Sequence, residues 1–360
     1  MIEKQDPMCD DWRWQIKSSI RSIDDLIKYL PKNNNILDWS ATHFKSVALP
    51  FSVTPYFASL MNGELTCPIF LQVISTSNEL MVDHTDMVDP LGEEERQHVP
   101  HLVHRYPDRV LFLATDRCAS YCRFCMRKRW VGQGPTTARD QQEEAFRYIE
   151  EHAEVREIIF SGGDPLLLSN ERIYELLKRA FSIRHIDIVR FHSRMLSFAP
   201  MRIDNELAEI FKQFSPVYLV SHFNHRQEIT SKTLDAVNLL IAAGVVMLNQ
   251  SVLLKGVNDD DQILKDLMRT LIKMRIKPYY LHQCDVITGA RHFRVPLARS
   301  IALVEKLRGH LSGLCQPTLV IDIPGGHGKV ALHGNPIVRE DEHFIYLRGF
   351  KGEIAAYPKN

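Results

Sequence analysis

Thr115-Asp-Arg-Cys-Ala-Ser-Tyr-Cys-Arg-Phe-Cys-Met-Arg-Lys-Arg129 places Cys118, Cys122 and Cys125 in a CxxxCxxC pattern. Structural zinc sites usually take four ligands in two short pairs, and no second cysteine pair follows this triplet. Three cysteines can instead bind three irons of a [4Fe–4S] cube and leave the fourth iron open to a ligand that is not protein. The pattern therefore favours an iron–sulfur cluster; a structural zinc knuckle or three buried free thiols are the alternatives.

Composition indicates an ordinary globular protein. The chain has 360 residues, 45% hydrophobic and 24% charged, which is enough for a barrel-sized core with smaller additions. Lys and Arg number 44, as do Asp and Glu, so we expect neither a nucleic acid nor a membrane as partner. No signal-peptide pattern or long apolar stretch is present, and we expect a cytoplasmic location.

Seven cysteines is an odd number, and three of them lie in one loop. A disulfide framework is therefore not expected. We predict that the remaining four are free thiols: Cys9, Cys67, Cys284 and Cys315.

The first hundred residues predict an N-terminal, mostly helical elaboration. Apolar residues at spacings of three and four predict one helix over Asp11–Leu30, which Pro31 ends. Four prolines between residues 50 and 90 divide the rest into short pieces with no clean strand and helix repeat. We therefore place this elaboration at residues 1–100.

From Arg109 onward, short β-rich runs alternate with helical stretches at intervals of about thirty residues, which is typical of parallel βα units. Six such units fall short of the eight in a closed barrel, so we predict an α/β fold with a partial (β/α)6 TIM-type barrel over residues 101–295. The predicted strands are Val110–Thr115, Glu157–Phe160, Ile186–Phe191, Val217–Ser221, Val245–Asn249 and Pro278–Leu281. The predicted helices are Arg139–His152, Asn170–Phe181, Asp204–Phe214, Thr230–Ala243 and Asp259–Met274.

Each predicted strand ends at a polar cluster. Barrel enzymes place their active sites at the carboxyl ends of the strands, so these clusters are expected to converge on one mouth. A chance arrangement of polar loop residues is the alternative. After the cysteine loop, the clusters are Ser161-Gly-Gly-Asp164, His192-Ser-Arg194, His222-Phe-Asn-His225, Asn249-Gln250 and His282-Gln-Cys-Asp285.

Residues 296–360 form the predicted C-terminal segment. After a helix near Pro296–Ser312, Thr318–Ile323 predicts one more strand, which leads into Pro324-Gly-Gly-His-Gly-Lys329. This loop lacks the spacing of a phosphate-binding P-loop. Its glycines allow close backbone approach, and its lysine could form a Schiff base with an aldehyde cofactor, with a solvated lysine as the alternative. The tail, Glu340–Lys359, predicts a terminal strand pair with glycines 349 and 352 near its turn.

The cysteine triplet resembles the signature of the radical S-adenosylmethionine (SAM) enzymes, in which the amino and carboxylate groups of SAM bind the open iron. Several phrases together resemble the lysine 2,3-aminomutase family, from about residue 11 to residue 358. Besides the cysteine loop, these phrases are Asp11-Trp-Arg-Trp14, His104-Arg-Tyr-Pro-Asp-Arg109, Ser161-Gly-Gly-Asp-Pro-Leu166, Asn249-Gln-Ser-Val-Leu-Leu254, Tyr279–Asp285, Arg308-Gly-His310 and Asp322–Lys329.

The resemblance implies a radical SAM partial barrel with a [4Fe–4S] cluster, SAM and pyridoxal 5′-phosphate (PLP). Lys329 matches the lysine that forms the internal aldimine with PLP, and the segment around it is expected to carry the PLP site. Arg105 and Arg109 match the family's ligands of the PLP phosphate. Two planar guanidinium groups suit a phosphate dianion, and surface ion pairing is their alternative role.

For SAM, Gly162, Gly163 and Asp164 match the motif that receives the amino group. The glycines allow backbone approach, and the carboxylate would accept from the ammonium. By position, three more residues are expected to contact SAM: Arg194, His222 and Gln250.

Three residues match the substrate site of the family. Arg127 matches the arginine that pairs with the substrate carboxylate, which its fork would bind bidentately. Asp285 and Asp322 match the two carboxylates that hold the side-chain ammonium of lysine. A glutamate-specific relative would need those carboxylates replaced, so the pair favours a cationic amino acid.

The implied reaction moves the α-amino group of free L-lysine to the β-carbon, giving β-lysine through PLP and a 5′-deoxyadenosyl radical. The alternatives are arginine or ornithine as substrate, β-lysine supply for modification of elongation factor P, and a non-catalytic metal-binding scaffold. We expect an external one-electron reductant of the flavodoxin or ferredoxin type, and a homo-oligomer. His327 departs from the all-glycine loop of many members, and its effect is left open.

Overall fold

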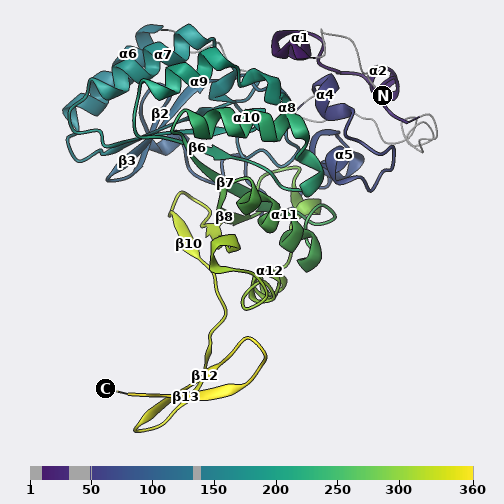
Figure 1. Cartoon of the computed structure of the whole chain (residues 1–360), viewed down its shortest axis with the longest axis vertical. Coiled ribbons are helices and arrows are strands. Elements are labelled where there is room, and N and C mark those ends of the chain that lie inside the picture. Colours follow the sequence, from purple (N-terminus) through teal and green to yellow (C-terminus); the bar gives the residue numbers. More distant parts are fainter. Residues whose placement is uncertain (1–9, 32–48, 50, 133–138, 360) are drawn as a thin grey trace.

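The computed structural model describes residues 10–31, 49, 51–132 and 139–359, and one sheet of ten strands dominates this part of the chain (Figure 1). The strands stand in sequence order, and every pair from β3 to β9 is parallel. The antiparallel strands β1, β2 and β10 extend the two ends. The strands are β1 (Gln97–Val99), β2 (Leu102–Tyr106), β3 (Arg109–Thr115), β4 (Glu157–Gly162), β5 (Ile188–Ser193), β6 (Val217–Ser221), β7 (Val246–Leu253), β8 (Lys277–Gln283), β9 (Thr318–Asp322) and β10 (Lys329–Ala331).

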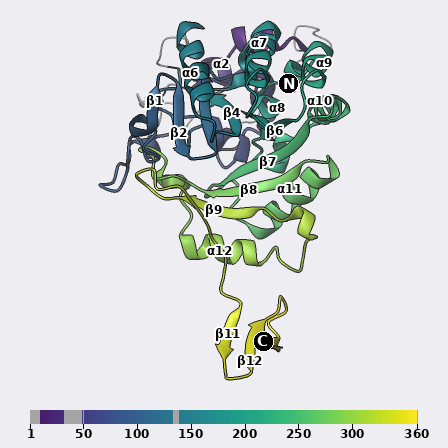
Figure 2. The ribbon, with the colours of Figure 1, turned by 90° about the vertical axis from the view of Figure 1, so that its left-hand side faces the viewer.

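Helices connect the parallel strands and cover the outer face of the sheet (Figure 2). Side chains cap their first turns: Ser169, Thr230 and Asp260 each accept a hydrogen bond from a backbone N–H there. The alternation confirms the predicted α/β fold of the partial-barrel type. The connecting helices are α6 (Arg139–Glu151), α7 (Asn170–Phe181), α8 (Met195–Phe198), α9 (Asn205–Lys212), α10 (Ser231–Ala242) and α11 (Asp261–Lys273); α12 (Leu297–Glu305) follows β8.

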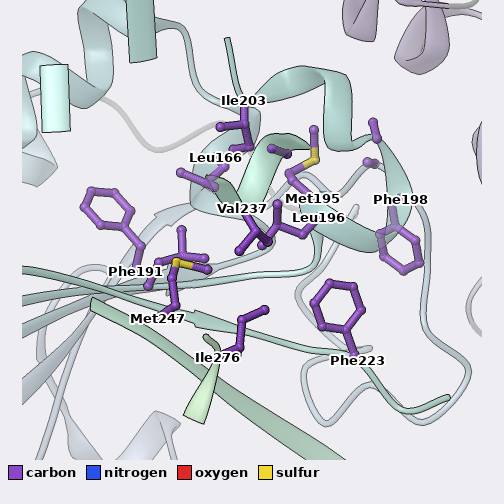
Figure 3. Packing of buried hydrophobic residues seen from close by; sticks show 14 of the residues in the cluster. Leu166, Phe191, Met195, Leu196, Phe198, Ile203, Phe223, Val237, Met247 and Ile276 are labelled. Carbon is purple, nitrogen blue, oxygen red and sulfur yellow. The ribbon is translucent and has the colours of Figure 1, made fainter. Parts of the chain in front are cut away.

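The main core lies between the sheet and these helices. Phe160 and Phe191, on adjacent strands, have ring centroids 5.1 Å apart, and the Phe191 ring meets Phe211 of α9 at 5.4 Å. Figure 3 shows Phe191 beside Met247 of β7 in this cluster. Each fully buried side chain of this size contributes about 1.5–3 kcal/mol, so the layer fixes which face of each strand points away from the core.

The predicted single helix over Asp11–Leu30 is wrong. Two short helices replace it, α1 (Trp12–Lys17) and α2 (Ile23–Ile27), and Ile20 between them pairs with Val53 in a β-bridge. Ser22 accepts from the Asp25 N–H and so caps a new helix start. The apolar spacing alone did not reveal this break. Two more short helices follow: α4 (Pro55–Ala58) and α5 (Pro68–Val73).

The parallel sheet continues beyond residue 295, where we had expected the barrel to end. Strand β9 pairs in parallel with β8, and β10 turns back antiparallel to β9. This pairing sets Lys329 directly opposite Asp322. The glycine loop is therefore a hairpin on the last edge of the main sheet.

A separate three-stranded sheet ends the chain and stands away from the main body (Figures 1 and 2). The predicted terminal pair is present as its last two strands, joined by a turn with glycines 349 and 352. Most side chains of the sheet are exposed. Its strands are β11 (Ile337–Glu340), β12 (Phe344–Arg348) and β13 (Ile354–Pro358).

Three of the four cysteines expected to be free thiols are free and buried, namely Cys67, Cys284 and Cys315, and Cys9 lies outside the described residues. No helix in the part of the chain described by the structure has the length and apolar character needed to cross a membrane.

Candidate active site

One cavity of about 310 Å³ lies inside the curve of the parallel strands, towards their carboxyl ends. Such a volume is in the range of small-molecule sites. All fifteen residues proposed from the sequence line it: Arg105, Arg109, Cys118, Cys122, Cys125, Arg127, Gly162, Gly163, Asp164, Arg194, His222, Gln250, Asp285, Asp322 and Lys329.

The cysteine loop follows β3 and presents three sulfurs to the cavity. Burial raises the pKa of Cys118 well above its usual value and that of Cys125 to about 11, so thiolates here need a cation to offset their charge. Cys122 Sγ accepts a hydrogen bond from Arg194 Nη1 at 2.9 Å. No three His, Cys, Asp or Glu side chains among the described residues meet at a single-ion position. An iron–sulfur cube does not require its three cysteines to meet at one ion position, because each cysteine binds a different iron.

The turn at Gly162 and Gly163 packs directly on the cysteine loop. Gly163 N–H donates to Thr115 O at 2.6 Å, and Gly162 has a φ of +120°. A Cβ on Gly163 would lie 2.1 Å from the Arg117 carbonyl oxygen. The two loops can therefore approach this closely only because these positions are glycine.

A Gly163→Ala variant should lose stability by about 1–3 kcal/mol, because the added methyl group meets backbone that cannot move aside cheaply. Since the cysteine loop must shift with it, we expect SAM to bind at least about tenfold more weakly. Thermal unfolding and equilibrium dialysis with SAM measure the two effects. The matched control is Gly313→Ala, where no atom lies within 4 Å of the added carbon; equal behaviour of the two variants would contradict this account.

Asp164 is braced by the protein. It accepts from Ser193 Oγ at 2.7 Å, Arg194 N at 2.8 Å and Leu166 N at 3.1 Å. These bonds take three of its roughly four acceptor positions. These contacts hold the loops after β4 and β5 together, and acceptance from a SAM ammonium stays a prediction for the remaining acceptor position.

Arg194 is likewise engaged within the protein. Besides Cys122, its guanidinium donates to His222 O at 3.1 Å, Gln72 Oε1 at 3.0 Å and Glu228 Oε2 at 2.9 Å. Four of its five N–H donors are thus used, which leaves little for direct ligand contact. It ties the cysteine loop to the ends of β5 and β6.

His222 differs from Arg194. Burial and the Arg194 charge hold the pKa of His222 well below its usual value, so the ring is neutral. Its Nε2 is buried without a hydrogen bond among the described residues. Together with Gln250 on β7, this residue lines the cavity wall.

Arginine side chains gather at the opposite end. Arg105 donates from Nη2 to Leu91 O at 2.6 Å, and its Nε has no partner in the described structure. Arg109 pairs with Asp108 at 2.6 Å and lies 3.9 Å from the Tyr106 ring. Arg190, which the sequence analysis did not select, lines the same region and pairs with Glu157 at 3.0 Å. This end of the cavity suits a polyanion.

The two candidate carboxylates have opposite electrostatics. Burial alone would raise the pKa of Asp322, but contacts with His282 and Lys329 outweigh burial and hold this pKa at about 2. Its Oδ1 lies 3.0 Å from Lys329 Nζ and 3.5 Å from Arg105. Burial and the Asp322 charge raise the pKa of Asp285 to about 7. Within the described part of the chain, the Asp285 carboxylate forms no hydrogen bond or ion pair, so it is open to a cation from the cavity.

The predicted bidentate fork of Arg127 is already occupied. Its Nε and Nη2 donate to the Glu93 carboxylate at 2.9 and 2.6 Å, and Nη1 donates to Ser161 Oγ at 3.2 Å. The segment carrying Glu93 is held in turn by Gly325 N–H, which donates to Pro90 O. Arg127 therefore meets the cavity mainly through Nη1 in this conformation, and its bidentate contact with a substrate carboxylate stays a prediction.

Sequence reasoning missed several lining residues. His192 was in a predicted polar cluster but was given no role, and Arg190 could have been found because it precedes His192 by two residues on the same face of β5. His282 precedes Asp285 in a motif that was read only for its carboxylate. Glu93 gave no local signal, since its partner lies 34 residues away.

Comparison with known proteins identifies two matching family models: the Radical SAM superfamily over residues 112–268 and lysine-2,3-aminomutase over residues 304–360. The L-lysine 2,3-aminomutase of Bacillus subtilis is 41% identical over 97% of this chain and 74% of its own length. That of Clostridium subterminale is also 41% identical, over 97% of this chain and 84% of its own length. The glutamate 2,3-aminomutase of Clostridioides difficile is 35% identical, over 96% and 82%.

Among solved structures, a radical SAM methyltransferase from Sphaerobacter thermophilus matches 61% of this chain and 68% of its own, with a TM-score of 0.42 and 19% identity. The family assignment rests on the near-complete sequence matches. The chain therefore belongs to the lysine 2,3-aminomutase family of radical SAM isomerases, whose cofactors are a [4Fe–4S] cluster, SAM and PLP.

Proposed function

We propose that this protein moves the α-amino group of free L-lysine to the β-carbon and so forms β-lysine. The observation that carries the proposal is the pair Asp285 and Asp322 in one cavity with Arg127. An amino acid with a cationic side chain would meet carboxylates at one end and a guanidinium at the other. Because the family also includes a glutamate enzyme, this charge pattern supports a cationic amino acid over glutamate, and the likeness to lysine enzymes favours lysine among the cationic ones.

The cofactors fit the ends of the cavity. Cys118, Cys122 and Cys125 would hold the cluster, and the backbone at Gly162 and Gly163 would receive SAM beside His222 and Gln250. When bound, the cluster and SAM supply a radical able to abstract hydrogen, and PLP carries the migrating amino group. An external one-electron reductant of the flavodoxin or ferredoxin type would reduce the cluster.

At the opposite end, Arg105 and Arg109 would hold the PLP phosphate, and the unpartnered Arg105 Nε offers a donor for it. Arg190 adds positive charge there. Lys329 Nζ and Arg105 Nη1 lie 3.0 and 3.5 Å from the same Asp322 oxygen, so Lys329 is beside the arginine end, which suits its proposed role as the PLP anchor.

In this structure, the Lys329 ammonium forms an ion pair with Asp322, with Nζ 3.0 Å from Oδ1. A second ammonium at the same carboxylate would be repelled by it. If Lys329 holds PLP through its amine, its own charge is lost and Asp322 becomes free for the substrate. The Lys329 contact supports Asp322 as a carboxylate that can hold the substrate ammonium, with Asp285 as the second carboxylate.

Lysine affinity should depend on pH through Asp285. Its raised pKa of about 7 means that protons compete with the substrate ammonium below that pH. The ammonium binds the ionised carboxylate, so we expect the KM for lysine to fall about tenfold as pH rises from about 6 to about 8. Asp322 stays ionised throughout, because its pKa is about 2.

Asp285→Asn should remove this pH dependence and raise the KM for lysine about tenfold or more, through loss of a charge-assisted hydrogen bond. The control is Asp187→Asn, since Asp187 is 57% exposed and pairs only with Arg156 on the outer surface. A pH profile of lysine binding that is unchanged in Asp285→Asn would assign the dependence to another group.

An anaerobic assay tests the proposed function. Reconstituted protein with SAM, PLP and reductant is offered lysine, arginine, ornithine or glutamate, and NMR follows the position of the amine. We expect β-lysine as the main product. If arginine, ornithine or glutamate is turned over faster than lysine, that amino acid is the substrate and the lysine assignment is wrong. Absence of any β-amino product would overturn the proposal as a whole.

A further inference from the structure

Strand β5 and the residue that follows it present a row of basic side chains to the cavity. Arg190 and His192 on the strand, and Arg194 just after it, line the cavity, whereas Phe191 between the first two is buried in the core. The row spans roughly 13 Å along the strand. Arg190 lies at the arginine end, and Arg194 contacts Cys122 at the cluster end. His192 therefore lies midway, where the reacting part of a substrate would have to sit.

The His192 ring has no partner within the described structure. Neither ring nitrogen forms a hydrogen bond there. Nε2 has no accessible surface, so a ligand in the cavity would meet the Nδ1 edge of the ring. A buried polar group without a hydrogen bond is costly, so such groups in functional sites often find their partner in a ligand. His192 also lines the cavity, so a ligand bound there can contact its ring.

The surroundings of His192 favour an anionic partner. Burial first, and then the charges of Arg190, Arg127 and Lys329, hold its pKa well below the usual value. The ring is therefore neutral, with one N–H donor. Among several cations, the ligand group most stabilised beside this donor is an anionic oxygen.

Arg127 alone offers an incomplete carboxylate site. Glu93 takes its Nε and Nη2 edge, which leaves mainly Nη1, already near Ser161. A carboxylate has two oxygens with about four acceptor positions, so it needs donors besides this one. His192 is a free donor that faces the same cavity.

We propose that His192 donates a hydrogen bond to the α-carboxylate of the amino acid substrate and completes the carboxylate site with Arg127. This inference rests on the proposed function, because it requires an amino acid in the cavity. His192 is thus a substrate-binding residue that the sequence motifs did not reveal.

The test compares lysine with lysine amide, in which a neutral carboxamide replaces the carboxylate. Binding is measured on protein loaded with cluster, SAM and PLP but without reductant, through the change in PLP absorbance. We expect His192→Ala to bind lysine about tenfold more weakly or worse, with little change for lysine amide. His192→Gln, which keeps an N–H donor, should recover part of the affinity. The matched control is His98→Ala, since His98 is exposed on β1 outside the cavity.

Iron and PLP contents equal to wild type show that each variant is folded and loaded; where His192→Ala fails this check, His192→Gln and a His192→Asn variant provide the comparison. Equal weakening for lysine and lysine amide, or no weakening for either, would overturn the inference. The inference would also be overturned if the His192 variants lost PLP but still distinguished lysine from lysine amide as wild type does. If wild-type protein binds no lysine, the proposed function itself fails, which separates the two outcomes.

Discussion

We expect Cys122→Ala to abolish β-lysine formation and to remove most of the cluster iron from the protein. Two remaining thiolates would leave a [4Fe–4S] cube with two unprotected irons, whereas its chemistry needs a single open one. The substitution also removes the acceptor for Arg194 Nη1, which ties the cysteine loop to β5. Iron and sulfide analysis, visible absorbance and the anaerobic lysine assay measure the effect.

Cys67→Ala is the matched control, because Cys67 is a buried free thiol at 1% exposure and does not line the cavity. This variant should keep its iron and its activity, with at most a modest loss of stability from the small gap in the core. Full iron content and wild-type turnover in Cys122→Ala would show that the cysteine triplet does not hold a catalytic cluster.

Lys329→Ala should also reduce turnover of lysine to below detection, while the iron content stays normal. Without the amine, PLP would no longer be anchored beside the substrate carboxylates, and the protein would retain less of it. A small added amine should restore a fraction of the activity. PLP absorbance, retained PLP after gel filtration, and β-lysine formation with and without methylamine are the measurements.

The comparison variant is Lys212→Ala, because the Lys212 side chain is 60% exposed and forms an ion pair with Glu209 on α9, away from the cavity. It should behave as wild type in all three measurements. A Lys329→Ala variant that turns over lysine normally without added amine would remove Lys329 from the reaction and, with it, the reading of the glycine hairpin as the PLP site.

The location of the site was predictable because parallel strands align their carboxyl ends. Residues as distant as Cys118 and Asp285 could be placed together once the βα alternation was recognised, whereas Asp322 was assigned through the family resemblance. The near agreement of the helix ends with their predictions reflects local capping, as at Ser169 and Asp260.

What could not be predicted depends on contacts between distant side chains. Glu93 and Arg127 meet across 34 residues, and neither position carries a pattern that announces the other. For the same reason, the engagement of Asp164 and Arg194 within the protein was invisible: a motif identifies a carboxylate or a guanidinium, but not how many of its hydrogen bonds are already made. The break at Ile20 was set by its bridge to Val53, also a tertiary contact.

The alternation along β5 limits which changes of chain length this fold can accept. A strand has two faces, so a one-residue deletion between α7 and β5 that the strand absorbs by slipping would exchange them. Phe191 would then turn into the cavity, and Arg190, His192 and Arg194 would be driven into the hydrophobic layer. The length of residues 182–187 is therefore as constrained during evolution as the identity of any ligand-binding side chain, although none of these six residues lines the cavity.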